Sequence, residues 1–90
     1  MDYSEEVIRK TSEIEDILCD KYHAHGRTFG EIINSVRKKL SPRTIGKLNI
    51  LLKVRNNIVH QGGYKFNKFR FRTLASDIID DLKEGKRLQF

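Results

Sequence analysis

An arginine and a histidine five positions apart, Arg55 and His60, are the residues of this chain best suited to chemistry. A guanidinium is always charged in proteins, and its planar fork matches phosphate oxygens. Histidine is the side chain whose ordinary pKa allows proton transfer near neutral pH. Asn56, one helical turn before His60, can hydrogen-bond the imidazole or share a ligand with it. These three groups are what a metal-free attack on an RNA phosphodiester needs.

The residues around this pair resemble a known family signature. The stretch Leu51-Leu52-Lys53-Val54 precedes the Arg, and Gln61-Gly62 follows the His. Arg followed by Asn, with His five residues after the Arg, resembles the motif helix of the HEPN family (higher eukaryotes and prokaryotes nucleotide-binding). The resemblance implies an all-α fold, a homodimer whose two motifs line one cleft, and RNA cleavage that leaves a 2′,3′-cyclic phosphate without a metal ion.

The resemblance also implies roles for individual residues. His60 would take a proton from a ribose 2′-hydroxyl or give one to the leaving oxygen. Arg55 would hold the scissile phosphate and stabilise the charge that develops on it, and Asn56 would orient His60 or the phosphate. Small family members typically act in toxin–antitoxin or phage-defence systems. The resemblance therefore adds an antitoxin, or another protein partner, to RNA and a second copy of the chain.

The same residues also have a purely structural interpretation. On a helical wheel, Arg55 falls in the middle of the apolar arc of its helix, where an unpaired charge is expensive to bury. Arg55 would then pair with an acid of the first helix, such as Glu13 or Asp16, and His60 would cap its own helix near the last carbonyls. Alternatively, this face borders a wet groove at a subunit interface.

Size and composition exclude several classes of protein. Ninety residues form one domain, 1–90, with a modest core that a dimer interface would extend. The chain has no apolar run of about 18 residues and opens on acidic, polar residues, which predicts neither a membrane helix nor a secretory signal. The single cysteine, Cys19, favours a reducing cytoplasm. No paired metal-ligand spacing and no cofactor motif is present.

The net charge of +6 is unevenly distributed along the chain. Residues 32–76 contain eleven Lys and Arg and no acid, whereas residues 1–31 contain eight acids and four bases. A basic middle that also holds the motif predicts a phosphate-rich partner, although a solvated surface would explain a charge run alone. The predicted RNA contacts are Lys53, Tyr64, Lys65 and Lys68.

Aromatic and basic residues alternate after the motif, between residues 64 and 72. Rings in such a stretch can stack bases while the cations hold the backbone. They can equally anchor a helix in the core. We expect Phe71 to be a core residue, and the sequence leaves Phe69 open between the two roles.

Capping residues and glycines divide the chain into four predicted helices. Thr28 and Glu31 form a capping box, Ser41-Pro42 starts a third helix, and Asn67 caps a fourth. The expected ranges are about 4–24, 28–40, 42–61 and 67–84. Apolar residues recur at helical spacing in each range, and the loops are short. The sequence therefore predicts an all-α, single-domain, antiparallel four-helix bundle, HEPN-like and dimeric.

The function predicted first is a cytoplasmic, metal-independent RNA endonuclease that acts at a dimer cleft. The alternative is a non-catalytic HEPN-like module that binds RNA or a partner protein through its basic face. A third hypothesis is a small inhibitor or adaptor whose basic surface meets an acidic protein. Loss of cleavage on replacing His60, with RNA binding retained, separates the first hypothesis from the second.

Overall fold

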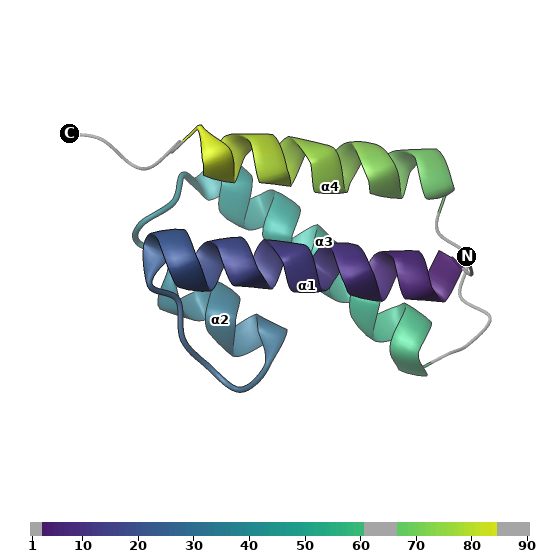
Figure 1. Cartoon of the computed structure of the whole chain (residues 1–90), viewed down its shortest axis with the longest axis horizontal. Helices are drawn as coiled ribbons and strands as arrows, with labels where there is room; N and C mark the ends of the chain where they lie inside the picture. The colour runs from purple at the N-terminus through teal and green to yellow at the C-terminus, as the bar shows by residue number, and fades with distance from the viewer. Residues whose placement is uncertain (1–2, 61–66, 85–90) are drawn as a thin grey trace.

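The computed structural model describes residues 3–60 and 67–84, in which helices pack against one another through short connections (Figure 1). The helices in these ranges are α1 (Tyr3–Tyr22), α2 (Phe29–Ser35), α3 (Pro42–His60) and α4 (Lys68–Lys83). The radius of gyration is 12.7 Å, close to the roughly 13 Å expected for a domain of about 100 residues. The described residues form no strand, which confirms the all-α prediction.

The predicted starts of α2 and α4 are confirmed by their capping side chains. The Thr28 hydroxyl accepts from the Glu31 amide at 3.1 Å. The Glu31 carboxylate accepts from the amide of Arg27, at 2.9 Å, rather than from Thr28. The Asn67 side-chain oxygen accepts from the Phe69 and Arg70 amides at 2.8 and 3.2 Å. Each side chain satisfies amides that have no partner within the helix.

Two helices end earlier than their apolar spacing predicts. The last residue of α1 is Tyr22, because His23 has a left-handed backbone (φ 58°) and the Ala24 amide donates back to the Leu18 carbonyl at 3.0 Å. A residue in the left-handed conformation directly after the last turn is a common way for a helix to end. The helix α2 stops at Ser35, and residues 36–39 form turns that still bury Val36. The second helix is therefore seven residues long.

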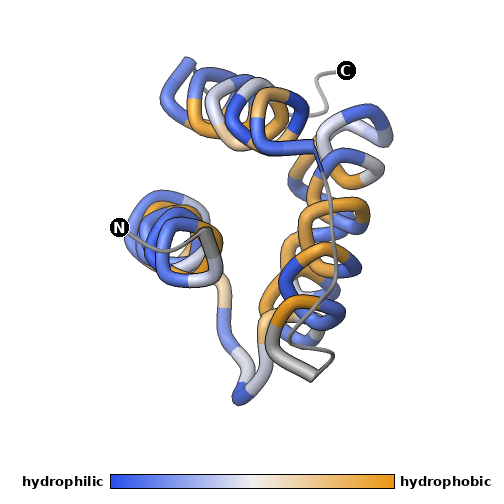
Figure 2. The backbone as a smooth tube through the Cα atoms, turned by 90° about the vertical axis from the view of Figure 1, so that its right-hand side faces the viewer, coloured by the Kyte–Doolittle hydropathy of each residue, from blue (hydrophilic) through white to orange (hydrophobic). Residues whose placement is uncertain are grey.

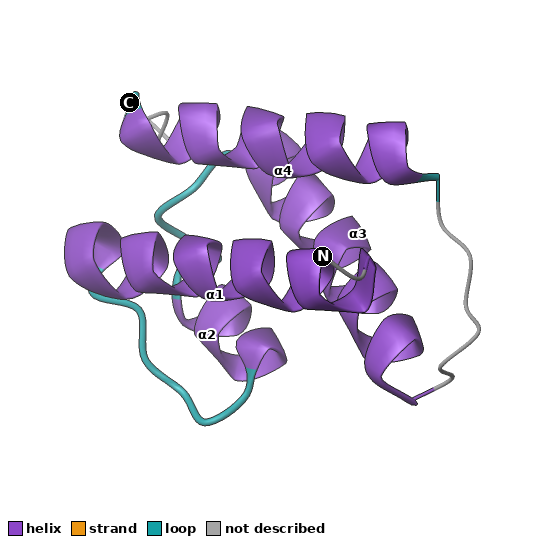
Figure 3. Ribbon diagram, turned by 45° about the vertical axis from the view of Figure 1, so that its right-hand side comes forward, coloured by secondary structure: helices purple, strands orange, loops and turns teal. Residues whose placement is uncertain are grey.

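The prediction that neighbouring helices are all antiparallel is wrong for α1 and α4. Glu6 contacts Arg72 and Tyr22 contacts Leu82, so α1 and α4 lie side by side and run the same way (Figures 1 and 3). The start of α3 lies against the end of α4, so these two are antiparallel. The helix α2 is only about 10 Å long. It packs on α1 and α3 and, within the described ranges, does not contact α4.

One hydrophobic core joins the four helices (Figure 2). Its fully buried side chains include Val7, Ile14, Leu18, Val36, Leu48, Leu51, Phe71, Ile78 and Leu82. The Tyr22 hydroxyl donates to the Leu82 carbonyl at 2.7 Å, which ties the ends of α1 and α4 together. Phe71 is confirmed as a core residue. Within the described ranges, no helix is long and apolar enough to cross a membrane.

Candidate functional site

The last two turns of α3 carry the motif. Val54 and Ile58 of this segment, and Leu51 in the preceding turn, are buried in the core. Arg55 lies among them on the helical wheel, as the sequence predicts, yet its side chain is only partly buried. Arg55 as a whole therefore keeps some contact with water, which reduces the large penalty of burying an unpaired charge.

Two polar groups of the described residues interact with the guanidinium of Arg55. Its Nη1 donates to the Asn56 side-chain oxygen at 3.4 Å, a long and weak bond. The second neighbour is Glu15 of α1, which is partly buried. Burial raises the pKa of the Glu15 carboxyl above its usual value, and the positive charge of Arg55 offsets only part of that rise. Asp16, the next residue on α1, raises the pKa of Glu15 further.

The acid near Arg55 is not one that the sequence indicates. The structural interpretation expects Glu13 or Asp16, but both side chains are exposed, and Glu13 pairs with Lys10 at 3.5 Å. Glu15 follows the buried Ile14 and lies at the edge of the buried face of α1. No carboxylate of the described residues lies within 4.0 Å of the Arg55 nitrogens. The interaction with Glu15 is thus a longer-range attraction rather than a closed ion pair.

The other predicted site residues fall at the same end of the molecule or outside the described residues. Lys53 is exposed on α3, and Asn56 is partly buried. His60 is the last residue of α3, and its side chain lies outside the described part. Tyr64 and Lys65 lie outside the described residues altogether.

Lys68, the remaining predicted RNA contact, is the first residue of α4 and is exposed. Its positive charge contributes to lowering the pKa of Glu6. The end of α3 and the start of α4 lie at the same end of the molecule, together with the start of α1 (Figure 1). The fold therefore brings Lys68 to the end that carries the motif.

The Lys and Arg residues in the middle of the sequence do not form one surface of unpaired cations. Lys47 pairs with Asp81 at 3.0 Å, and Arg72 pairs with Glu6 at 2.7 Å. The Lys39 ammonium donates to the Tyr22 carbonyl at 2.8 Å. These cations therefore hold helices and loops together. Arg55 of the motif and the nearby Lys53 form no ion pair with any described residue.

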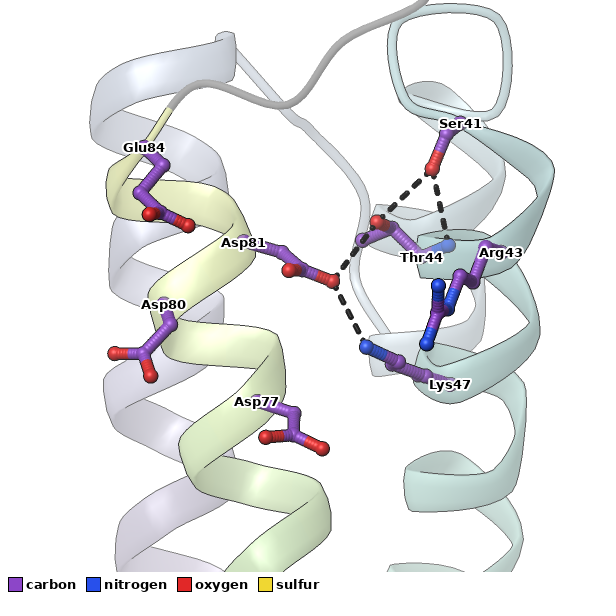
Figure 4. Close-up of a pocket in the computed structure, with 8 residues that line it drawn as sticks. All are labelled: Ser41, Arg43, Thr44, Lys47, Asp77, Asp80, Asp81 and Glu84. Atoms are coloured by element: carbon purple, nitrogen blue, oxygen red, sulfur yellow. Dashed lines mark hydrogen bonds and ion pairs between the residues drawn. The ribbon is translucent and has the colours of Figure 1, made fainter.

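Sequence reasoning missed a polar cluster between the start of α3 and the end of α4 (Figure 4). Asp81 is 8% exposed, and its Oδ2 accepts from Lys47 Nζ at 3.0 Å and from Thr44 Oγ1 at 3.3 Å. The Ser41 hydroxyl donates to Thr44 Oγ1 at 3.1 Å. The sequence does indicate a buried polar group here, because the acid Asp81 interrupts the apolar stripe between Ile78 and Leu82.

The cluster borders a cavity of about 330 Å³ with acids on the α4 wall and cations on the α3 wall. The cavity is lined by Ser41, Arg43, Thr44, Lys47, Asp77, Asp80, Asp81 and Glu84. In the described ranges, no three His, Cys, Asp or Glu side chains converge in a way that could hold a metal ion. The contacts of Asp81 are to the chain itself, so the cluster acts as a link between α3 and α4.

Comparison of the chain with protein-family models, with curated proteins and with solved structures found no match. The residues of the motif and their surroundings are therefore the features that indicate a function.

Proposed function

We propose that this protein is a HEPN-type RNA endonuclease that works without a metal ion, with Arg55, Asn56 and His60 at the reacting phosphate. The observation that carries this proposal is the state of Arg55. Arg55 is partly exposed on a helix face that also carries the buried Leu51, Val54 and Ile58, and it has one weak bond to Asn56 and no ion pair with the described residues. A guanidinium offers five N–H donors, so most are available to a phosphate.

The proposed reaction is an internal transfer at phosphorus. His60 accepts the proton of the ribose 2′-hydroxyl as the 2′-oxygen bonds to the phosphorus. Arg55 stabilises the negative charge that grows on the phosphoryl oxygens. The bond from phosphorus to the 5′-oxygen then breaks, and a proton delivered to that oxygen completes the step. The products are a 2′,3′-cyclic phosphate and a 5′-hydroxyl.

A homodimer is part of this proposal, because two motifs at one cleft supply two imidazoles, one to accept a proton and one to donate it. The resemblance that suggests the dimer also suggests a cytoplasmic toxin or phage-defence protein held by an antitoxin. The measured mass in solution tests the dimer. A monomer at micromolar concentration contradicts the shared cleft.

The test of the reaction is cleavage of single-stranded RNA in EDTA by the wild type and by His60→Ala and Arg55→Ala. We expect His60→Ala to lose about 10²- to 10⁴-fold in rate and Arg55→Ala about 10²- to 10³-fold. Arg55→Lys should rescue little, because an ammonium lacks the planar fork. Ile50→Ala, which removes an exposed side chain elsewhere on α3, is the matched control.

Two outcomes contradict the proposal. One is RNA that stays intact with folded wild-type protein, and the other is cleavage that survives His60→Ala. Either outcome favours the alternative, a non-catalytic helical module that binds RNA or a protein. One observation favours this alternative, since Arg55 is attracted to the Glu15 carboxyl of its own chain in the absence of any RNA. Such a module predicts that His60→Ala changes little, whereas Arg55→Ala weakens RNA binding and reduces its salt dependence.

A further inference from the structure

Phe69 is the most exposed large apolar side chain of the described residues. It is 77% exposed, compared with 50% for Ile50 and 44% for Ile8. Phe71, two positions later, is fully buried. Helical geometry points the two rings in different directions, so the fold assigns Phe71 to the core and leaves Phe69 in water. Exposing a phenyl ring forgoes stabilisation that burial would give, and packing against the described residues does not account for its position.

The backbone that carries Phe69 is held in place. The Asn67 side chain accepts from the Phe69 amide at 2.8 Å and from the Arg70 amide at 3.2 Å. The ring therefore stands on the first turn of a capped helix. A ring on an ordered backbone loses less freedom when it binds a partner.

Phe69 lines a shallow, widely open groove of about 360 Å³ on the surface of α4. The partly buried Leu74 also lines the groove, with Thr73 beside it. Arg70 borders the groove near its start and Asp77 near its end. An apolar surface with a cation at one end and an acid at the other suits a flat ligand whose negative charge lies at the Arg70 end.

The charge near Phe69 is positive. Arg70 is exposed, and its side chain forms no ion pair or hydrogen bond with the described residues. Lys68, on the other side of the ring in sequence, is also exposed. Arg72 is engaged with Glu6 at 2.7 and 3.0 Å. Arg70 is thus the cation of this turn that is best placed to meet a phosphate.

We propose that Phe69 stacks an unpaired base of single-stranded RNA while Arg70 holds a neighbouring phosphate. The base lies in the groove toward Leu74, and the backbone lies on the Arg70 side, away from Asp77. Every base has a flat face that can stack on a phenyl ring, whereas the bases of a duplex are already stacked on each other. This inference rests on the proposed function and narrows the substrate to RNA with an accessible single strand.

Two features favour RNA over a second copy of the chain as the occupant. Two copies meeting at Phe69 would bring their Lys68 and Arg70 cations together, on chains that each carry a net charge of +6. The start of α4 also lies at the end of the molecule where α3 presents Lys53, Arg55 and Asn56 (Figures 1 and 3). One strand of RNA can therefore run from the groove toward the motif.

The test measures binding separately from cleavage. The probe is a fluorescein-labelled, unstructured oligonucleotide of 2′-O-methyl RNA, which lacks the hydroxyl needed for attack, and a hairpin of the same composition is the comparison. Phe69→Ala should weaken binding of the single strand on the order of 10- to 100-fold. Phe69→Trp should retain it, and Ile50→Ala is the control for loss of an exposed apolar side chain. Sedimentation of each variant reports its mass.

The outcomes separate this inference from the proposed function. Phe69-dependent binding of the single strand, with the hairpin bound more weakly, supports the inference even if no RNA is ever cleaved. Affinity unchanged in Phe69→Ala overturns it, whether or not Arg55 and His60 prove to be catalytic. Concentration-dependent self-association that Phe69→Ala abolishes, with RNA affinity unaltered, also overturns it and assigns the groove to a second copy.

Discussion

Replacement of Asp81 by Asn tests the link between α3 and α4. Asp81 is the one acid of the described residues that is buried, at 8% exposure. The substitution keeps the size of the side chain and an oxygen that can accept from Thr44. It removes the charge that faces Lys47 Nζ at 3.0 Å. The change therefore isolates the ionic part of the cluster.

The expected loss of stability depends on how exposed the side chains of Asp81 and Lys47 are to water. Removing one member of a fully buried ion pair costs about 3–5 kcal/mol, and a hydrogen bond to a charged group contributes about 1.5–3 kcal/mol. The Lys47 side chain is 20% exposed, so its ammonium regains water when Asp81 is neutral. We therefore expect Asp81→Asn to reduce the free energy of unfolding by about 2 kcal/mol. For a domain of this size, Tm falls by roughly 8–16 °C.

Thermal and urea unfolding followed by circular dichroism at 222 nm measure this loss. Lys47→Met and the double variant complete a cycle that isolates the interaction between the two side chains. We expect a coupling of about 1–2 kcal/mol, above the roughly 0–1 kcal/mol typical of exposed pairs. Glu13→Gln, which breaks the exposed pair with Lys10 at 3.5 Å, is the control. If Asp81→Asn costs no more than Glu13→Gln, burial does not strengthen this pair, and the reasoning fails.

Two further predictions concern Glu15 and Gly26. Burial raises the pKa of Glu15 above its ordinary value of 4.5. Just above pH 4.5, the folded chain therefore binds more protons than the unfolded chain. The free energy of unfolding falls as the pH rises through this window. Glu15→Gln should remove this fall and raise Tm at pH 7, as measured by thermal unfolding at several pH values from 4 to 7. A lower Tm of the variant at pH 7 would mean that the attraction of Glu15 to Arg55 outweighs the cost of its burial. Gly26 has φ +147°, and an added Cβ would lie 2.6 Å from Glu31 Cβ and 2.9 Å from the Ile32 nitrogen. Gly26→Ala should therefore cost about 2 kcal/mol or more by urea unfolding, whereas Gly46→Ala, in open space, should gain about 0.5–1 kcal/mol; similar effects at both positions would refute the argument.

The beginnings of α2 and α4 were predictable because capping is local chemistry. Thr28 and Asn67 bind amides two or three residues away, and these side chains identify the helix starts without any knowledge of the fold. The end of α2 was not predictable in this way. Its apolar spacing continues to Leu40, but the chain tightens into turns, with the Lys39 amide donating to the Val36 carbonyl at 2.9 Å. The Lys39 ammonium also bonds to the Tyr22 carbonyl, a contact that depends on where α1 ends.

The candidate site was predictable only within one helix. The helical wheel of α3 places Arg55 on the buried face from the sequence alone. The identity of the nearby acid depends on how α1 is rotated toward α3, which the spacing of Glu13, Glu15 and Asp16 does not specify. The Asp81 cluster joins residues 34 and 37 positions apart. Finding it required the antiparallel contact of α3 with α4, and therefore the topology.

The parallel contact between α1 and α4 also affects how the chain folds during synthesis. Glu6 and Arg72 are 66 positions apart, and Tyr22 and Leu82 are 60 apart. The contact of α1 with α4 therefore forms only after most of the chain has been made. A ribosome that adds about 5–20 residues per second takes roughly 3–12 s to make the segment between Tyr22 and Leu82. During that interval, α1 has only α2 and α3 to cover Val7, Ile14 and Leu18. Such a large sequence separation slows folding relative to helical proteins whose contacts are local. We expect that the nascent chain exposes apolar surface until α4 has emerged, and that chaperones bind it in this interval.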